Sequence, residues 1–203
     1  MPTSNLCNGW LDSARHCPSP NCNPRPKGCT PKMLVIHNIS LPPGQFGSDD
    51  VESLFCNTLD CSSDPAFAEL EGLRVSAHFF IDRHGTLTQF VSCLERAWHA
   101  GASSWCGTTD CNDFSIGIEL EGTDVLAYEN AQYERLSQLV SELRMQLPSL
   151  VPGAIVGHSD IAPGRKTDPG KAFDWSRLRR LLSVARTPLT QDVQNALTEK
   201  GRV

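Results

Sequence analysis

Two histidines stand where strands are expected to end, and an aspartate follows in a nearby loop. His37 closes the apolar run Met33–His37, and His158 follows the short apolar run at 155–156. Asp168 lies ten residues after His158, in the loop IAPGRKTDPG. Short apolar runs of this kind predict buried strands. Two histidines and one carboxylate, with a fourth position left open, are the ligand set of a catalytic zinc hydrolase, so a metal site is one interpretation of this pattern.

Two further side chains could complete a hydrolytic site. Glu119 lies on the polar face of a third predicted strand, Ser115–Leu120, where a carboxylate can act as a general base. Lys166 lies in the same loop as Asp168 and could stabilise a developing oxyanion. Spacing alone leaves two alternatives open. The histidines could be hydrogen-bonded structural residues, or the ligands could come from a competing set, His78, His84 and His99.

The elements that must position these residues are a mixture of strands and helices. Segments 75–81 and 86–91 flank a turn at 82–85 and predict a hairpin. Segment 130–147 predicts a helix that Pro148 ends, because its apolar residues fall at helical spacing: Tyr133, Leu136, Leu139, Val140, Leu143 and Leu147. Asp174 can cap a second helix. Intermixed strands and helices indicate an α/β (α+β) fold with one sheet.

Length and composition bound the remaining possibilities. The chain has 203 residues, which predicts a single domain over 1–203, with a core at about 10–186 and a polar tail at 187–203. Its net charge of −5 argues against nucleic-acid and anionic-membrane partners. It contains neither a signal-peptide pattern nor an apolar run of about 20 residues. We therefore expect a cytoplasmic protein, and a monomer because no long exposed apolar stripe is evident.

Nine cysteines are many for a cytoplasmic protein. Three pairs of them share a spacing of five positions, and no Cys-x-x-Cys motif occurs. Free thiols are expected in a reducing compartment. Two alternatives remain: disulfides, which would leave at least one thiol unpaired, or a structural zinc bound by Cys7, Cys17, Cys22 and Cys29, with or without His16.

Five separated segments resemble one known family, in the same order along the chain. They are VIHNISLPPGQFG, LRVSAHFFIDRHG, RAWHAGASSW, CNDFSIGIELEGTD and GHSDIAPGRKTDPGKAFDW. The sequence is similar, from about Trp10 to Leu182, to the cytosolic anhydro-N-acetylmuramoyl-L-alanine amidases. These belong to the zinc amidase superfamily that includes the peptidoglycan recognition proteins. The resemblance implies a single α/β domain, with a central mixed sheet flanked by helices and zinc in a surface groove.

The same resemblance implies a role for each matching residue. One zinc ion per chain would be bound by His37, His158 and Asp168, with Glu119 as the acid/base group and Lys166 as the catalytic lysine. The substrate would be an anhydro-muropeptide, cleaved at the amide between anhydro-N-acetylmuramic acid and L-alanine during cell-wall recycling. Residues implied to contact it or to line the groove are Asn38, Arg74, Trp98, His99, Ala162 and Arg165. Trp98 could instead be a packed aromatic side chain, and Arg165 could only brace the loop.

Two departures from the family pattern bear on specificity. Asp110 stands where enterobacterial members carry a ligand-binding arginine, and Gly164 replaces a glutamate. Two alternative functions therefore remain. One is an amidase that also cleaves intact, non-anhydro peptidoglycan fragments. The other is a non-catalytic module that binds muropeptides, which the competent residues at all three ligand positions and both catalytic positions argue against.

Overall fold

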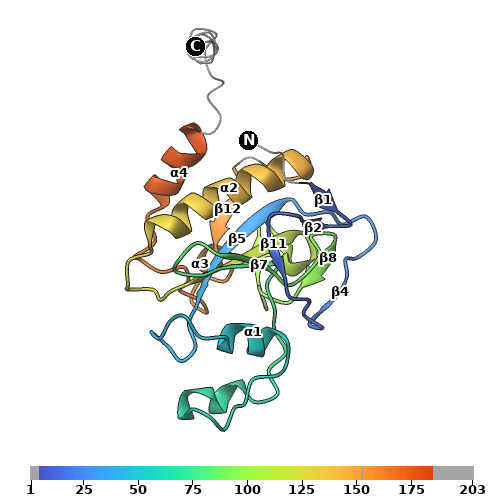
Figure 1. Ribbon diagram of the computed structural model, residues 1–203. Coiled ribbons are helices and arrows are strands. Elements are labelled where there is room, and N and C mark those ends of the chain that lie inside the picture. The colour runs from blue at the N-terminus through green and yellow to red at the C-terminus, as the bar shows by residue number, and fades with distance from the viewer. Residues whose placement is uncertain (1–4, 152, 185–203) are drawn as a thin grey trace, which may run out of the picture.

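A six-stranded sheet forms the centre of the computed structural model, which describes residues 5–151 and 153–184 (Figure 1). The predicted tail at 187–203 lies outside these residues. The strand order is β12-β5-β11-β6-β7-β3. Only β6 and β7 pair antiparallel, as the predicted hairpin, and the other neighbours are parallel. The sheet is therefore mixed, as predicted, and its strands are β3 (Arg15–His16), β5 (Met33–Ile39), β6 (Phe79–Ile81), β7 (Leu87–Gln89), β11 (Ser115–Glu121) and β12 (Ile155–Gly157).

Short elements surround this sheet. Three two-stranded antiparallel pairs join β1 (Leu6–Cys7) to β2 (Trp10–Leu11), β4 (Cys22–Pro24) to β8 (Glu95–Ala97), and β9 (Ser104–Trp105) to β10 (Thr108–Thr109). Two 3-10 helices are η1 (Pro65–Leu70) and η2 (Cys111–Asp113). Strand β4 lies within segment 16–31, HCPSPNCNPRPKGCTP, whose many prolines and few apolar residues are typical of an irregular loop. The first hairpin strand starts at Phe79 rather than Val75, because the backbone N–H of Ser76 donates to Trp98 O outside the hairpin.

The central strand β11 is buried on both faces. Ile116, Ile118 and Leu120 join the main apolar core, as their predicted alternation requires. Ser115 and Glu119, on the opposite face, are also buried. Parallel sheets are usually covered on both faces, so a polar residue on this strand must face a protein-lined site rather than open solvent.

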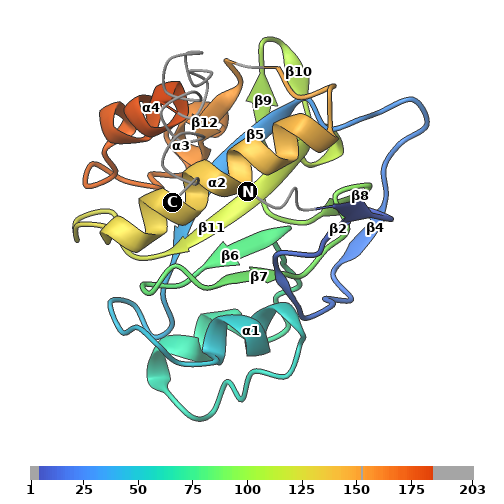
Figure 2. The ribbon, with the colours of Figure 1, turned by 45° about the horizontal axis from the view of Figure 1, so that its top comes forward.

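Two helices cover the apolar face of the sheet (Figures 1 and 2). The predicted long helix is α2 (Asn130–Gln146), and Glu129 and Gln132 cap its first turn reciprocally. Its apolar stripe packs into the main core. Helix α4 (Trp175–Val184) lies beside it and starts at the predicted cap, where Asp174 Oδ1 accepts from the backbone N–H of Arg177 at 2.8 Å.

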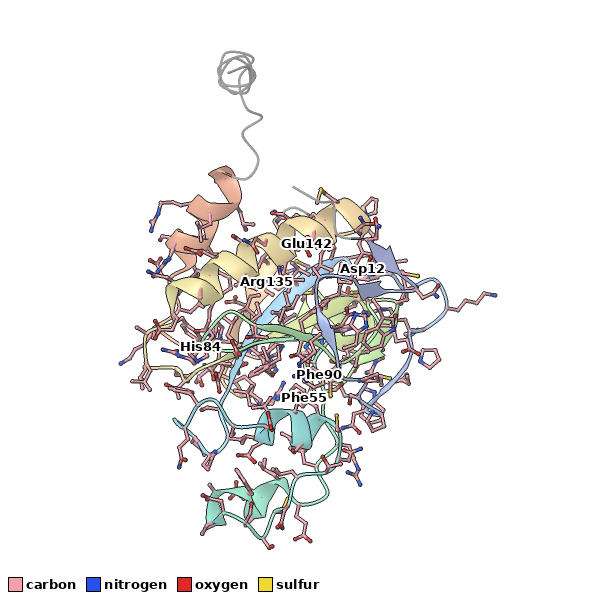
Figure 3. All side chains as sticks on the ribbon, in the orientation of Figure 1. Asp12, Phe55, His84, Phe90, Arg135 and Glu142 are labelled. Atoms are coloured by element: carbon pink, nitrogen blue, oxygen red, sulfur yellow. The ribbon has the colours of Figure 1, made fainter. Side chains whose placement is uncertain are left out.

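A second apolar cluster lies under helix α1 (Asp50–Phe55). The rings of Phe55 and Phe90, which are labelled in Figure 3, meet edge to face in this cluster with their centroids 5.1 Å apart. Phe80, which points to the opposite face from Phe79 and Ile81, joins the same cluster. The sheet therefore packs helices on both faces, and α1 forms one wall of the groove described below.

All nine cysteines are free thiols in the structure. Two of the pairs spaced by five positions are Cys17/Cys22 and Cys56/Cys61. Their first members lie close together, with Cys17 Sγ 3.5 Å from Cys56 Sγ. Among the described residues, no helix is long and apolar enough to cross a membrane.

Candidate active site

His37 and His158 meet where two neighbouring parallel strands end. His37 lies near the end of β5, and His158 directly follows β12 as the first residue of the short helix α3 (His158–Ile161). Strands β5 and β12 are paired in parallel, so their carboxyl ends lie at one edge of the sheet. That edge is where α/β sheets commonly bind ligands. The pairing brings together two side chains that are 121 positions apart.

Asp168 completes a three-residue cluster with these histidines. The atoms His37 Nδ1, His158 Nδ1 and Asp168 Oδ2 lie 3.0 Å from one another. Both histidines are buried, and the carboxylate side chain is 14% exposed. Among the residues that the structure describes, this is the one group of three His, Cys, Asp or Glu side chains that could hold a metal ion, and no cysteine belongs to it.

The hydrogen bonds around His158 suit a cation at this point. His158 Nε2 lies 3.0 Å from the carbonyl oxygen of Ala100, which can only accept. Arg165 Nη2 lies farther away, at 3.3 Å, and its two hydrogens are directed to the carbonyl oxygens of Ala100 and Ala102 at 2.6 and 2.7 Å, so Nε2 carries the proton. The Nδ1 atom therefore presents a lone pair toward the Asp168 carboxylate, with no proton between them. A tetrahedral ion with zinc-like bond lengths would separate its ligand atoms by about 3.3 Å, close to the 3.0 Å found here. The cluster fits a metal ion in position, donor type and protonation.

Glu119 lies beside this cluster because of strand register. Glu119 on β11 pairs directly with His37 on β5, so both side chains emerge from the same face. Glu119 is 9% exposed, and its Oε2 atom has no hydrogen-bond partner in the protein. Burial, reinforced by the Asp168 charge, raises the pKa of Glu119 well above its ordinary value, and Lys166 opposes this shift. A carboxyl group of this kind is ready to exchange a proton with a substrate or water.

These residues line a groove of about 710 Å³. Lys166 is exposed in its wall, so its ammonium group is free to meet a ligand. Asp124, which no sequence pattern indicated, also lines the groove and accepts a hydrogen bond from Asn38 Nδ2 at 2.9 Å. Apolar residues form part of both sides, including the exposed Leu73 and Val125. The groove therefore offers charged groups beside the cluster and apolar surface farther away.

Three of the six expected substrate residues lie in the groove with protein partners of their own. Asn38 is bound to Asp124, as above. Trp98 Nε1 donates to Asn23 Oδ1 at 2.6 Å, which fixes the indole in the groove wall. His99 Nδ1 lies 2.9 Å from His37 Nε2. The structure thus brings all three to the groove, and His99 directly to the candidate metal cluster.

The other three expected residues occupy different surroundings. Arg165 also lines the groove, but its guanidinium donates to the carbonyl oxygens of Ala100 and Ala102, which braces the loop. Ala162 is buried, and its carbonyl oxygen accepts from the backbone N–H groups of Arg165 and Lys166. Arg74 is exposed between two groove residues, Leu73 and Val75, but is not itself among the described lining residues. Asp110 is also exposed and does not line the groove.

The loop that carries Asp168 is fastened by contacts that the sequence did not reveal. Asp168 O accepts from the backbone N–H of Ser159, and Pro169 O accepts from the hydroxyl of Tyr128 at 2.8 Å. Gly170 has φ +76°, and a Cβ atom there would overlap the backbone of Asp124. The contacts with Tyr128 and Asp124 come from segments far from this loop in the chain, so no local pattern predicts them.

Stability of the metal-free protein should fall on acidification. Burial lowers the pKa of His37 to about 4 and that of His78 to about 3, and it lowers the pKa of His99 well below its usual value. These side chains bind protons near pH 6.5 only when the chain unfolds, so the unfolded state gains protons as the pH falls. Each histidine should remove about 1.4 kcal/mol of stability per pH unit below pH 6.5, until its folded pKa is reached.

Thermal unfolding in the presence of a chelator, at pH values from 7 down to 4, measures this effect. The exposed His84 provides the control, since His84→Gln should leave the slope unchanged. A melting temperature that stays level from pH 6.5 to pH 5 would contradict the assignment of these histidines as neutral in the folded protein.

Comparison with known proteins identifies relatives over almost the whole chain. The sequence profile of the N-acetylmuramoyl-L-alanine amidase family matches residues 27–171. The chain is 53% identical over 179 residues to 1,6-anhydro-N-acetylmuramyl-L-alanine amidase AmpD of Escherichia coli (strain K12), covering 88% of this chain and 97% of that protein. A crystal structure of a selenomethionine derivative of AmpD superposes with a TM-score of 0.85 at 51% identity, covering 88% of this chain and 99% of that one.

A more distant solved structure contains a ligand. It is the complex of the Escherichia coli N-acetylmuramyl-L-alanine amidase AmiD with the substrate anhydro-N-acetylmuramic acid-L-Ala-D-gamma-Glu-L-Lys. It superposes with a TM-score of 0.55 at 30% identity and covers 77% of this chain and 60% of that chain.

Proposed function

The chain belongs to the N-acetylmuramoyl-L-alanine amidase family, and we propose that it hydrolyses the amide between anhydro-N-acetylmuramic acid and the L-alanine of a stem peptide. One observation carries this proposal: the cluster of His37, His158 and Asp168 lies in a groove beside a buried, unpartnered Glu119. Amide hydrolysis needs an activated water and a proton donor for the leaving amine. The groove contains residues suited to both needs.

We assign one zinc ion per chain to His37, His158 and Asp168. Two neutral imidazoles and one carboxylate are typical of catalytic zinc sites. Zinc bound there would lower the pKa of water and polarise the substrate carbonyl. The carboxylate also offsets part of the charge of the ion in a largely buried site.

Glu119 is the group that moves the proton. Its raised pKa lets the carboxylate accept a proton from the attacking water and hold it until the amide bond breaks. It then delivers this proton to the nitrogen of the leaving L-alanine, which departs as a neutral amine. No other polar group of the protein bonds to Glu119 Oε2, so nothing competes for the proton at that atom.

Lys166 stabilises negative charge on the substrate. Its exposed ammonium group lies in the groove wall, two residues before Asp168. In this position it can face the carbonyl oxygen as negative charge develops there, which is the role of an oxyanion-hole donor. We further propose that six residues shape the groove and its rim: Asn38, Arg74, Trp98, His99, Ala162 and Arg165. Asn38, Trp98 and Arg165 already bond to protein groups, so they hold the shape of the groove wall rather than offer free hydrogen-bonding groups to the substrate.

We also propose a cytoplasmic monomer that acts in cell-wall recycling. The 53% identity to AmpD over 97% of that protein supports the recycling role. The thiol state of all nine cysteines is consistent with a reducing compartment.

The proposal is tested by incubating the purified protein with two matched muropeptides, one with an anhydro end and one with a reducing end. Mass detection of the freed peptide should show cleavage of the anhydro compound. Equal turnover of both compounds would indicate the broader amidase alternative, for which the acidic Asp110 at the family's arginine position is the motivating feature. Binding without any released peptide would contradict the enzymatic assignment and favour a binding module.

A further inference from the structure

We propose that His99 is a positioning residue that sets the tautomer of His37, so that His37 presents the lone pair of Nδ1 to the metal. This inference rests on the proposed zinc site. It gives His99 a role distinct from substrate contact, since both of its ring nitrogens already have protein partners. Nδ1 lies 2.9 Å from His37 Nε2, and Nε2 lies 3.1 Å from Ser115 Oγ.

Hydrogen bonds link His37, His99, Ser115 and the carbonyl oxygen of Cys111 in series. The last of them decides which atom donates in each of the others. Ser115 Oγ lies 2.6 Å from the carbonyl oxygen of Cys111, which can only accept. The single hydroxyl hydrogen of Ser115 therefore points to Cys111. Its oxygen is left to accept from His99, so the proton of the His99 ring is on Nε2.

The same reasoning then passes to His37. With its proton on Nε2, neutral His99 has a lone pair on Nδ1 and accepts from His37 Nε2. The proton of neutral His37 is thus on Nε2, and its Nδ1 is the free lone pair that faces His158 Nδ1 and Asp168 Oδ2. Ligating histidines generally donate their second ring N–H to an outer partner in this way, which fixes ring orientation and tautomer.

Packing holds the His99 ring in the required orientation. The ring lies against Gly117 of the central strand, where an added Cβ atom would come within 2.5 Å of His99 Cγ. Asn112 Oδ1 accepts from the backbone N–H groups of His99 and Ala100, at 3.1 and 2.8 Å. Ala100 in turn offers its carbonyl oxygen to His158 Nε2. One buried asparagine therefore anchors the backbone that sets both histidine tautomers.

The deciding experiment compares His99→Leu with His99→Asn. Leucine removes the acceptor, whereas the Oδ1 atom of asparagine can occupy nearly the place of His99 Nδ1 and restore it. Zinc affinity is measured by competition with a chelator, alongside kcat and KM for an anhydro-muropeptide. We expect about 10–100-fold weaker zinc binding in His99→Leu, with most of the loss recovered in His99→Asn.

A buried histidine that packs on His99, with ring centroids 5.8 Å apart, but makes no hydrogen bond to it provides the control for packing alone. His78 bonds to Gly117 N and Glu95 O rather than to a candidate ligand, so His78→Asn should lower thermal stability and leave zinc affinity unchanged. If His99→Leu does not fold, Ser115→Ala is measured instead, since it removes the acceptor that orients His99, together with the hydrogen bond to Cys111 O, and leaves the His99 ring in place. Weakened zinc binding in that variant supports the inference.

The remaining outcomes oppose the inference in different ways. Unchanged zinc affinity in folded His99→Leu or Ser115→Ala, or an equal loss in His78→Asn, overturns it. So does a raised KM with normal zinc binding, which would mean that His99 contacts substrate. A wild-type protein that binds no zinc would instead refute the proposed function itself, so the two failures are distinguishable.

Discussion

The Glu119→Gln variant should keep its zinc and hydrolyse an anhydro-muropeptide about 10²–10⁴-fold more slowly than the wild type. Glutamine has the shape of glutamate but cannot accept and return a proton at the pH of the reaction. The loss should appear in kcat rather than in substrate binding. Glu119 Oε2 has no hydrogen-bond partner in the protein, so the substitution breaks no hydrogen bond at that atom that would shape the groove. Steady-state kinetics and metal analysis on the same preparation check both parts of this result.

The same substitution should not lower folding stability. The raised pKa of Glu119 means that the folded state binds its proton more tightly than the unfolded state does. The Glu119 contribution to the stability of the metal-free wild type therefore falls as the pH rises above the ordinary glutamate value, opposite in sign to the contribution of the three buried histidines, and the neutral amide removes this loss. At neutral pH and with a chelator present, Glu119→Gln should melt at or above the wild-type temperature.

Glu121 provides a matched control on the same strand and face. Its buried carboxylate accepts hydrogen bonds from the backbone N–H groups of Gly47 and Arg83, whereas Glu119 Oε2 has no such partner. Glu121 therefore holds two loops in place. Glu121→Gln should lower the melting temperature and retain hydrolysis. Normal turnover in Glu119→Gln, or an equal loss of turnover in both variants, would show that Glu119 is not the acid/base group.

The second large effect is expected from His158→Ala. Wild-type protein should contain about one zinc ion per chain, and the variant should contain almost none and have no measurable hydrolysis. Only two ligand side chains remain in the variant, whereas a catalytic zinc ion is normally held by three. Elemental analysis after gel filtration, together with the muropeptide assay, measures both losses.

An exposed histidine again provides the control, and the metal count itself can contradict the assignment. His84→Ala should keep its zinc and its activity, because His84 is exposed and lies outside the cluster. A full zinc content in His158→Ala would place the ion elsewhere. Two zinc ions per wild-type chain would restore the cysteine site built from Cys7, Cys17, Cys22 and Cys29 as a real alternative.

Local patterns were sufficient for the elements that carry a strong periodicity. The stripe from Tyr133 to Leu147 predicted α2 to within one residue of its end, and Asp174 caps α4 as expected. The alternation of Ile116 and Ile118 correctly indicated one apolar face of β11. The weakly patterned segment at 16–31 was a poorer guide, because β4 exists only through its pairing with β8.

The sequence by itself determined the class of fold, the family and the residue types able to bind a metal and move a proton. These follow from motif content and periodicity, which are properties of the chain order. Only the tertiary structure decided that Glu119 pairs with His37, that Arg165 is directed to backbone carbonyls, and that His99 lies against a candidate ligand. Strand register and hydrogen-bond direction depend on atoms up to 131 positions apart, as in the contact of His37 with Asp168, and only the folded chain brings those atoms together.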